Sequence, residues 1–114
     1  MNSLMIASKE QFESEVLKSH GKVSVGFATK VCAGCAFMQP EMINVHKEHP
    51  DFVMKSVFID DFPDLADQYG ITSSPTICIF KDGNLVGKQA LAEHEVSTVG
   101  AKEVAAWVVK MMTE

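Results

Sequence analysis

The sequence has no apolar stretch long enough to cross a bilayer, and positive charge is in the minority. Its 114 residues include 10 basic and 15 acidic side chains, for a net charge of −5 at pH 7. A membrane-spanning helix needs about 20 mostly apolar residues, and nucleic-acid-binding proteins usually present a basic face. We therefore expect neither a membrane nor a nucleic acid as a partner.

Cysteine is also scarce, with three residues in the chain. A small, odd number of cysteines does not suggest the disulfide framework of a secreted domain. The N-terminal residues lack the basic segment and the long apolar segment of a secretory signal. These absences predict a cytoplasmic protein whose cysteines are mostly reduced at rest.

Repeats, low-complexity tracts and linker-like runs of Pro, Gly or Ser are absent as well. The length suits one domain. The hydrophobic content of 46% and the charged content of 22% are ordinary for a globular protein. We expect a single domain over residues 1–114.

What is present is an alternation of strand-like and helix-like segments. Strands are expected at residues 4–6, 23–28, 52–59, 76–80 and 85–91. Helices are expected to begin at Ser8, near Ala36, after a cap at Asp60 or Asp61, and near Gly100. Asp82-Gly83 predicts a tight hairpin, and the β-α-β connections predict parallel pairs. The fold class is therefore α/β, with a mixed five-stranded sheet flanked by four helices.

The most informative motif is Cys32-Ala33-Gly34-Cys35, between a buried strand and a helix. The free N–H groups and the positive dipole end of a helix N-terminus favour a thiolate. Side chains at i and i+3 share a helix face, so the two sulfurs can meet. A C-x-x-C beside a βα pattern in an intracellular chain is typical of a redox dithiol.

Four features together make the chain resemble the thioredoxin family over nearly its whole length. They are the strand at 23–28 leading into the two cysteines, Pro40 five residues after the second, Ser74-Pro75-Thr76 at the entry to a strand, and the turn Phe80-Lys81-Asp82-Gly83. The resemblance implies a thioredoxin fold. It also implies that the Ser74–Pro75 peptide bond is cis and that Pro75 faces the dithiol.

The resemblance further implies a thiol–disulfide oxidoreductase with no bound cofactor. Cys32 would attack a disulfide of a protein substrate, and Cys35, the more buried cysteine, would release the product. A separate disulfide reductase or a small thiol would supply the electrons. The residues implied at the substrate site are Val31, Ala33, Gly34, Ser74, Pro75 and Thr76.

Several positions depart from the family pattern. Gly26 stands where typical members carry a buried Asp that is assigned to help deprotonate the second cysteine. Ala28-Thr29 replaces a Trp-Ala pair, and Ser56 replaces a lysine. These losses predict slower release of mixed disulfides than in a standard member. The segment at 90–99 is also longer than expected, with Ala92 and His94 nearest to the loop that completes the substrate groove.

Two other functions remain open at this point. The missing Asp and Trp groups also fit a catalytically weak thioredoxin-fold module that binds proteins or peptides. Alternatively, Cys32 and Cys35 would be half of a zinc site, but a structural zinc needs four ligands. His46 and His49 are expected at the far end of the helix, so no metal is predicted.

The third cysteine, Cys78, lies within Ile77-Cys78-Ile79 in a predicted strand. Free cysteine is among the most buried residue types. We expect Cys78 to be a small core residue.

Overall fold

A computed structural model of the chain describes residues 5–91 and 96–114. Along the chain these residues form α1 (Lys9–Phe12), a π-helical turn η1 (Glu13–Leu17), β1 (Lys22–Ala28), α2 (Cys35–Glu48), β2 (Val53–Phe58), a 3-10 turn η2 (Ile59–Asp61), α3 (Pro63–Gln68), β3 (Thr76–Lys81), β4 (Asn84–Ala90) and α4 (Thr98–Thr113). The predicted alternation of strands and helices is confirmed.

The sheet is mixed, as predicted, with the strand order β2-β1-β3-β4. β1 pairs parallel with β2 and antiparallel with β3, and β3 pairs antiparallel with β4. The prediction of a fifth strand is wrong, because the described part of the sheet has four. Met5 makes only an isolated parallel bridge to Ser56. The chain leaves the sheet edge at once, because Ser8 already caps α1.

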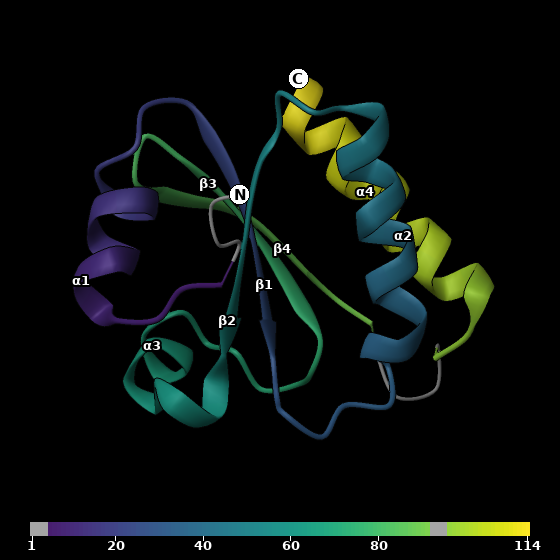
Figure 1. Cartoon of the computed structure of the whole chain (residues 1–114), viewed down its shortest axis with the longest axis horizontal. Helices are drawn as coiled ribbons and strands as arrows, with labels where there is room; N and C mark the ends of the chain where they lie inside the picture. The colour runs from purple at the N-terminus through teal and green to yellow at the C-terminus, as the bar shows by residue number, and fades with distance from the viewer. Residues whose placement is uncertain (1–4, 92–95) are drawn as a thin grey trace.

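Helices cover both faces of the sheet, with α1 and α3 on one side and α2 and α4 on the other (Figure 1). Alternation along the strands supplies a core to each side. Phe27 of β1 and Phe80 of β3 belong to the core under α1 and α3, whereas Ile77 and Ile79 belong to the core under α2 and α4. The two layers therefore share one sheet.

The helix starts follow from capping side chains. Ser8 Oγ accepts the Gln11 N–H at 3.0 Å, and Ser97 Oγ accepts the Gly100 N–H at 3.0 Å. The predicted cap of α3 at Asp60 or Asp61 is wrong, since both residues lie in η2. Pro63 opens α3 instead, because its fixed φ and missing N–H suit the first helical position.

The predicted hairpin between β3 and β4 is confirmed. Asp82 and Gly83 have φ angles of 50° and 85°, as a tight turn between twisted strands requires. Asp82 Oδ1 also accepts the Gly21 N–H at 2.8 Å. This hydrogen bond links the turn to Gly21, the residue just before β1.

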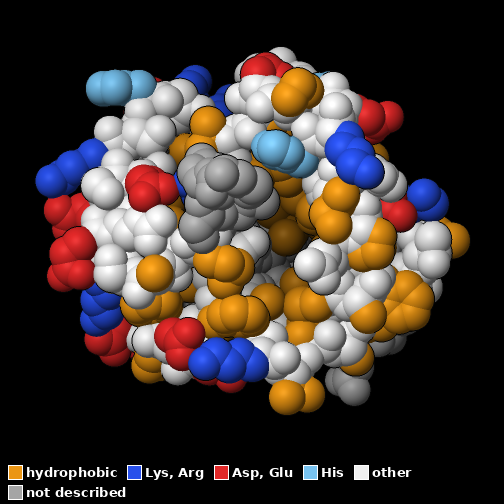
Figure 2. Space-filling model, viewed as in Figure 1, with side chains coloured by type: hydrophobic (Ala, Val, Ile, Leu, Met, Phe, Trp, Pro, Cys, Tyr) orange, Lys and Arg blue, Asp and Glu red, His pale blue; other side chains and the backbone are white. Residues whose placement is uncertain are grey.

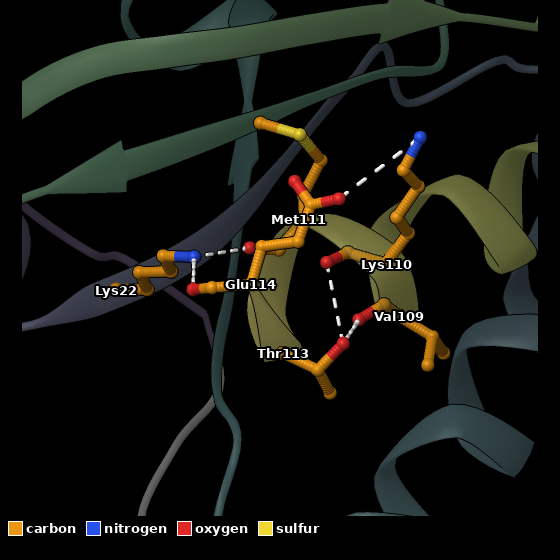
Figure 3. Close-up of polar contacts among 6 residues, drawn as sticks. All are labelled: Lys22, Val109, Lys110, Met111, Thr113 and Glu114. Atoms are coloured by element: carbon orange, nitrogen blue, oxygen red, sulfur yellow. Dashed lines mark hydrogen bonds and ion pairs between the residues drawn. The ribbon is translucent and has the colours of Figure 1, made fainter.

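The C-terminal end of α4 is joined to the start of β1 by Lys22 (Figure 3). Its ammonium group donates to the carbonyl of Met111 at 2.6 Å and also to the carbonyl of Glu114. A cation at this position complements the free carbonyls and the negative dipole end of a helix. The contact helps to fix β1, the strand that leads into the dithiol. No helix in the described residues is long and apolar enough to span a membrane.

Candidate active site

The two cysteines of the motif lie where β1 has ended and α2 begins. Cys32 and Cys35 are joined by a disulfide, with their Cα atoms 5.3 Å apart. Both residues are partly exposed. The Cys35 N–H, which has no partner within the first turn of α2, donates to Cys32 Sγ at 3.2 Å. The helix N-terminus therefore points a donor at the first cysteine, as the motif predicts.

The Ser74–Pro75 peptide bond is cis, as the resemblance implied. Gly34 packs directly against Pro75: a Cβ added to Gly34 would lie 2.7 Å from Pro75 Cδ. Gly34 has an ordinary helical φ of −65°. Its lack of a side chain therefore allows the close approach between the motif and residues 73–75, the loop before β3 that we call the proline loop.

The hydroxyl groups of Ser74 and Thr29 form a small cluster beside Cys32, which we call the hydroxyl cluster. Ser74 Oγ is 3.1 Å from Cys32 Sγ and accepts the Thr29 N–H at 2.8 Å. Thr29 Oγ1 donates to the carbonyl of Val31 at 2.6 Å. The family resemblance connects Ser74 only with backbone contacts to a substrate, and no sequence pattern predicts a role for Thr29. The two residues are 45 positions apart, so only the folded chain brings them together.

The other predicted substrate-site residues divide into two groups. Val31 is 93% exposed, and Ala33 is also exposed, so both lie on the surface beside the sulfurs. Thr76 is buried, and its hydroxyl donates to the carbonyl of Ser73 at 2.7 Å. Ala92 and His94 lie outside the described residues.

A cavity of about 620 Å³ adjoins the dithiol between α2 and the strands β1 and β2. Figure 2 shows a hollow on this face of the molecule with hydrophobic side chains around and beneath it. Its walls include the small residues Gly26, Ala28 and Ser56, together with Met42 and Cys35 itself. Gly26 and Ser56 are direct neighbours in the β1–β2 register. The departures from the family pattern thus cluster in space, and they leave room beside Cys35.

Two of the lysines that line the cavity, Lys30 and Lys55, form ion pairs with carboxylates. Lys30 forms an exposed ion pair with Asp61 at 2.9 Å, and this hydrogen-bonded carboxylate raises the pKa of Lys30. Lys55 is nearly buried and pairs with Glu15 at 2.7 Å, which lowers the pKa of Glu15. Among the described residues, the hydrogen-bond donors that contact the Cys32 sulfur are the Cys35 N–H and the Ser74 hydroxyl.

Cys78 lies in the opposite layer from this cavity. It is free, completely buried and part of the core under α1 and α3. Burial raises the pKa of its thiol to about 11. The prediction that Cys78 is a core residue is confirmed. Within residues 5–91 and 96–114, no group of three or more His, Cys, Asp or Glu side chains is placed to hold a metal ion.

A dithiol at the start of a helix, opposite a cis-proline at the entrance of a central strand, defines the class of thioredoxin-fold thiol–disulfide oxidoreductases. The sequence model of the family named Thioredoxin matches residues 3–105. The chain belongs to the thioredoxin family and is a thiol–disulfide oxidoreductase.

Individual relatives agree with this assignment. A thioredoxin of Chlamydia caviae is 34% identical over 83 residues, which cover 73% of this chain and 79% of the relative. Thioredoxin 1 of Synechococcus elongatus is 40% identical over 76 residues, covering 66% of this chain and 71% of the relative. The crystal structure of oxidised mitochondrial thioredoxin 3 from Saccharomyces cerevisiae has the same fold, with a TM-score of 0.75, 23% identity and coverage of 96% and 92%.

Proposed function

We propose that the protein is a reductase of protein disulfides in which Cys32 is the nucleophile and Cys35 the resolving thiol. One observation carries this assignment of roles. Cys32 Sγ lies near two hydrogen-bond donors, the Cys35 N–H at 3.2 Å and the Ser74 hydroxyl at 3.1 Å. Donors of this kind stabilise a thiolate, which is the attacking species in thiol–disulfide exchange.

The reaction begins from the reduced pair. The Cys32 thiolate forms a bond to one sulfur of the substrate disulfide, and the other substrate sulfur leaves with the electron pair and takes up a proton. The Cys35 thiolate, formed by loss of its proton, then attacks Cys32 Sγ. This step forms the Cys32–Cys35 disulfide seen here and releases the second substrate sulfur as a thiol. The substrate disulfide is reduced by two electrons, and the dithiol is oxidised by two.

The proline loop supports recognition of an extended substrate segment. The backbone N–H and C=O of Ser74 make no hydrogen bond within residues 5–91 and 96–114. Free backbone groups of this kind can pair with an added strand. Val31 and Ala33 are exposed next to Cys32 in the chain, Gly34 packs against Pro75, and Thr76 follows Pro75 at the start of β3. We assign these residues, with Ser74, to substrate binding.

The partners and the location follow from the same chemistry. The disulfide formed in each turnover has to be reduced again, so we propose a separate disulfide reductase or a small thiol as the electron donor. A dithiol that works as a reductant suits a reducing compartment, and we propose the cytoplasm. We also propose that residues 1–114 form one domain, which the sharing of one sheet by both cores supports.

The direct test is reduction of insulin disulfides driven by dithiothreitol. The native protein should accelerate the reaction, Cys32→Ser should not, and Cys78→Ser serves as the matched control with activity retained. If the native protein does no better than dithiothreitol alone, it is not a general protein-disulfide reductase. A protein-binding module would then be the better description.

A further inference from the structure

We propose that the Ser74 hydroxyl is a catalytic hydrogen-bond donor to Cys32, which stabilises the thiolate that attacks the substrate. This inference rests on the proposed role of Cys32 as the nucleophile. It adds a side-chain function to a residue that the resemblance connects only with backbone recognition of the substrate. The starting observation is the distance of 3.1 Å between Ser74 Oγ and Cys32 Sγ.

Counting the available protons shows why the Ser74 hydroxyl is free to donate to sulfur. Its oxygen already accepts the Thr29 N–H at 2.8 Å. The Thr29 hydroxyl has one proton and two neighbours, the Val31 carbonyl at 2.6 Å and Ser74 Oγ at 3.2 Å. The shorter contact to a carbonyl takes that proton. The Ser74 proton then has Cys32 Sγ and Thr29 Oγ1 within reach, and a charged thiolate is the stronger acceptor.

The surroundings strengthen the hydrogen bond between Ser74 and Cys32. Ser74 and Cys32 are both partly buried, so bulk water competes less for either group. The Thr29 N–H bond holds the Ser74 oxygen in place and polarises its O–H group toward the sulfur. Together with the Cys35 N–H, this gives the sulfur one donor from the helix and one from the proline loop.

The donor acts on two quantities with a definite sign. A hydrogen bond to the thiolate increases the thiolate fraction at neutral pH, which increases the rate of attack. It also stabilises the reduced protein relative to the disulfide, because the sulfur of a disulfide carries no charge and is a weaker acceptor. Loss of the Ser74 hydroxyl should therefore slow the reaction of Cys32 at low pH and make the dithiol easier to oxidise.

The experiment measures the rate at which iodoacetamide alkylates Cys32 in the reduced full-length chain, as a function of pH, with mass spectrometry to locate the label. Ser74→Ala should react about three- to tenfold more slowly than the native protein near pH 6. Near pH 10 it should react equally fast or faster, because the thiolate is then fully formed and is more nucleophilic when its pKa is higher.

Two further variants separate chemistry from damage to the fold. Ser74→Thr keeps the hydroxyl and should retain a profile close to native. Ser73→Ala removes the neighbouring, exposed hydroxyl and is the matched control, with no expected change. In a glutathione redox buffer, Ser74→Ala should move the equilibrium about three- to tenfold toward the disulfide form, whereas Ser73→Ala should not.

The outcomes are distinct. If Ser74→Ala has the native profile, or slows alkylation equally at every pH, Ser74 is not a thiolate donor. If Ser74→Thr fails to restore the low-pH rate, the hydroxyl is likewise not the operative group. The assignment of Cys32 as nucleophile fails separately, if the native protein itself is alkylated no faster at Cys32 than at Cys35.

Discussion

Cys32 and Cys78 place the same side chain in two opposite environments within one fold. Cys32 is partly exposed at the start of α2, near two hydrogen-bond donors. Cys78 is fully buried in the core between the sheet and the helices α1 and α3, and its thiol pKa is raised to about 11. Burial disfavours a thiolate and nearby donors favour it. Position in the fold, rather than residue type, therefore decides whether the surroundings of a cysteine favour or disfavour its thiolate.

The two faces of β1 show the same contrast. Val25 and Phe27 point to the core around Cys78 and are fully buried there. On the other face, Gly26 and Ala28 border the open cavity beside Cys35. One face of β1 thus packs tightly in the core that contains Cys78, and the other face borders the cavity beside the dithiol.

The largest effect on turnover is expected from Cys35→Ser. If Cys35 is the resolving thiol, as proposed, the mixed disulfide between Cys32 and a substrate should accumulate in this variant, and turnover with insulin should fall by at least about a hundredfold. Trapping followed by mass spectrometry reads out the covalent complex. A variant that releases its substrates at the native rate would show that Cys35 does not resolve the intermediate.

A smaller effect is expected from Gly34→Ala, which tests the contact between the motif and the proline loop. The added Cβ would stand 2.7 Å from Pro75 Cδ, so the loop or the helix start has to shift. We expect a loss of about 1–3 kcal/mol in the free energy of unfolding. Chemical denaturation measures it, and Ala33→Ser, a similar change at an exposed position, is the control. Native stability in Gly34→Ala would contradict the tight fit.

Gly26→Asp sharpens the contrast between the two faces of β1 by placing an acid beside Cys35. The structure has space, since a Cβ at this position would be in ordinary contact with Ile77 Cδ1 at 3.5 Å. A carboxylate that takes up the Cys35 proton should speed release of mixed disulfides, on the order of tenfold. Stopped-flow measurement of the release step tests this. Gly26→Asn, which has the same shape without the acid, should leave the rate unchanged, and an equal gain in both variants would exclude base catalysis.

The smallest expected effect is on the stability of the folded protein at alkaline pH, and it comes from the buried thiol of Cys78. Folding raises the Cys78 pKa from 9.0 to about 11, so the folded chain holds a proton that the unfolded chain loses earlier. This contribution to stability is complete below about pH 9 and is lost as the pH rises toward 11. Between these values Cys78→Ala should lose stability less steeply with pH than the native protein does. Equal slopes in denaturant titrations would contradict a protonated, buried Cys78.

The sequence predicts the parts of this account that depend on local patterns. The dithiol at a helix start, the Asp82-Gly83 hairpin and the burial of Cys78 all follow from neighbouring residues. The resemblance added the cis bond before Pro75. The prediction of a fifth strand was wrong because Met5 makes an isolated bridge to Ser56 and the helix α1 is already capped at Ser8, so the chain turns away before a strand can form. The contact of Ser74 with Cys32, and the space beside Gly26, depend on segments far apart in the chain and could only be found in the folded molecule.

The measurement that tests the central contrast most directly is alkylation of the reduced native protein near pH 7, with the labelled cysteines located by mass spectrometry. We expect rapid labelling of Cys32 and no labelling of Cys78 until denaturant unfolds the chain. Labelling of Cys32 and Cys78 at similar rates in the folded protein would contradict it.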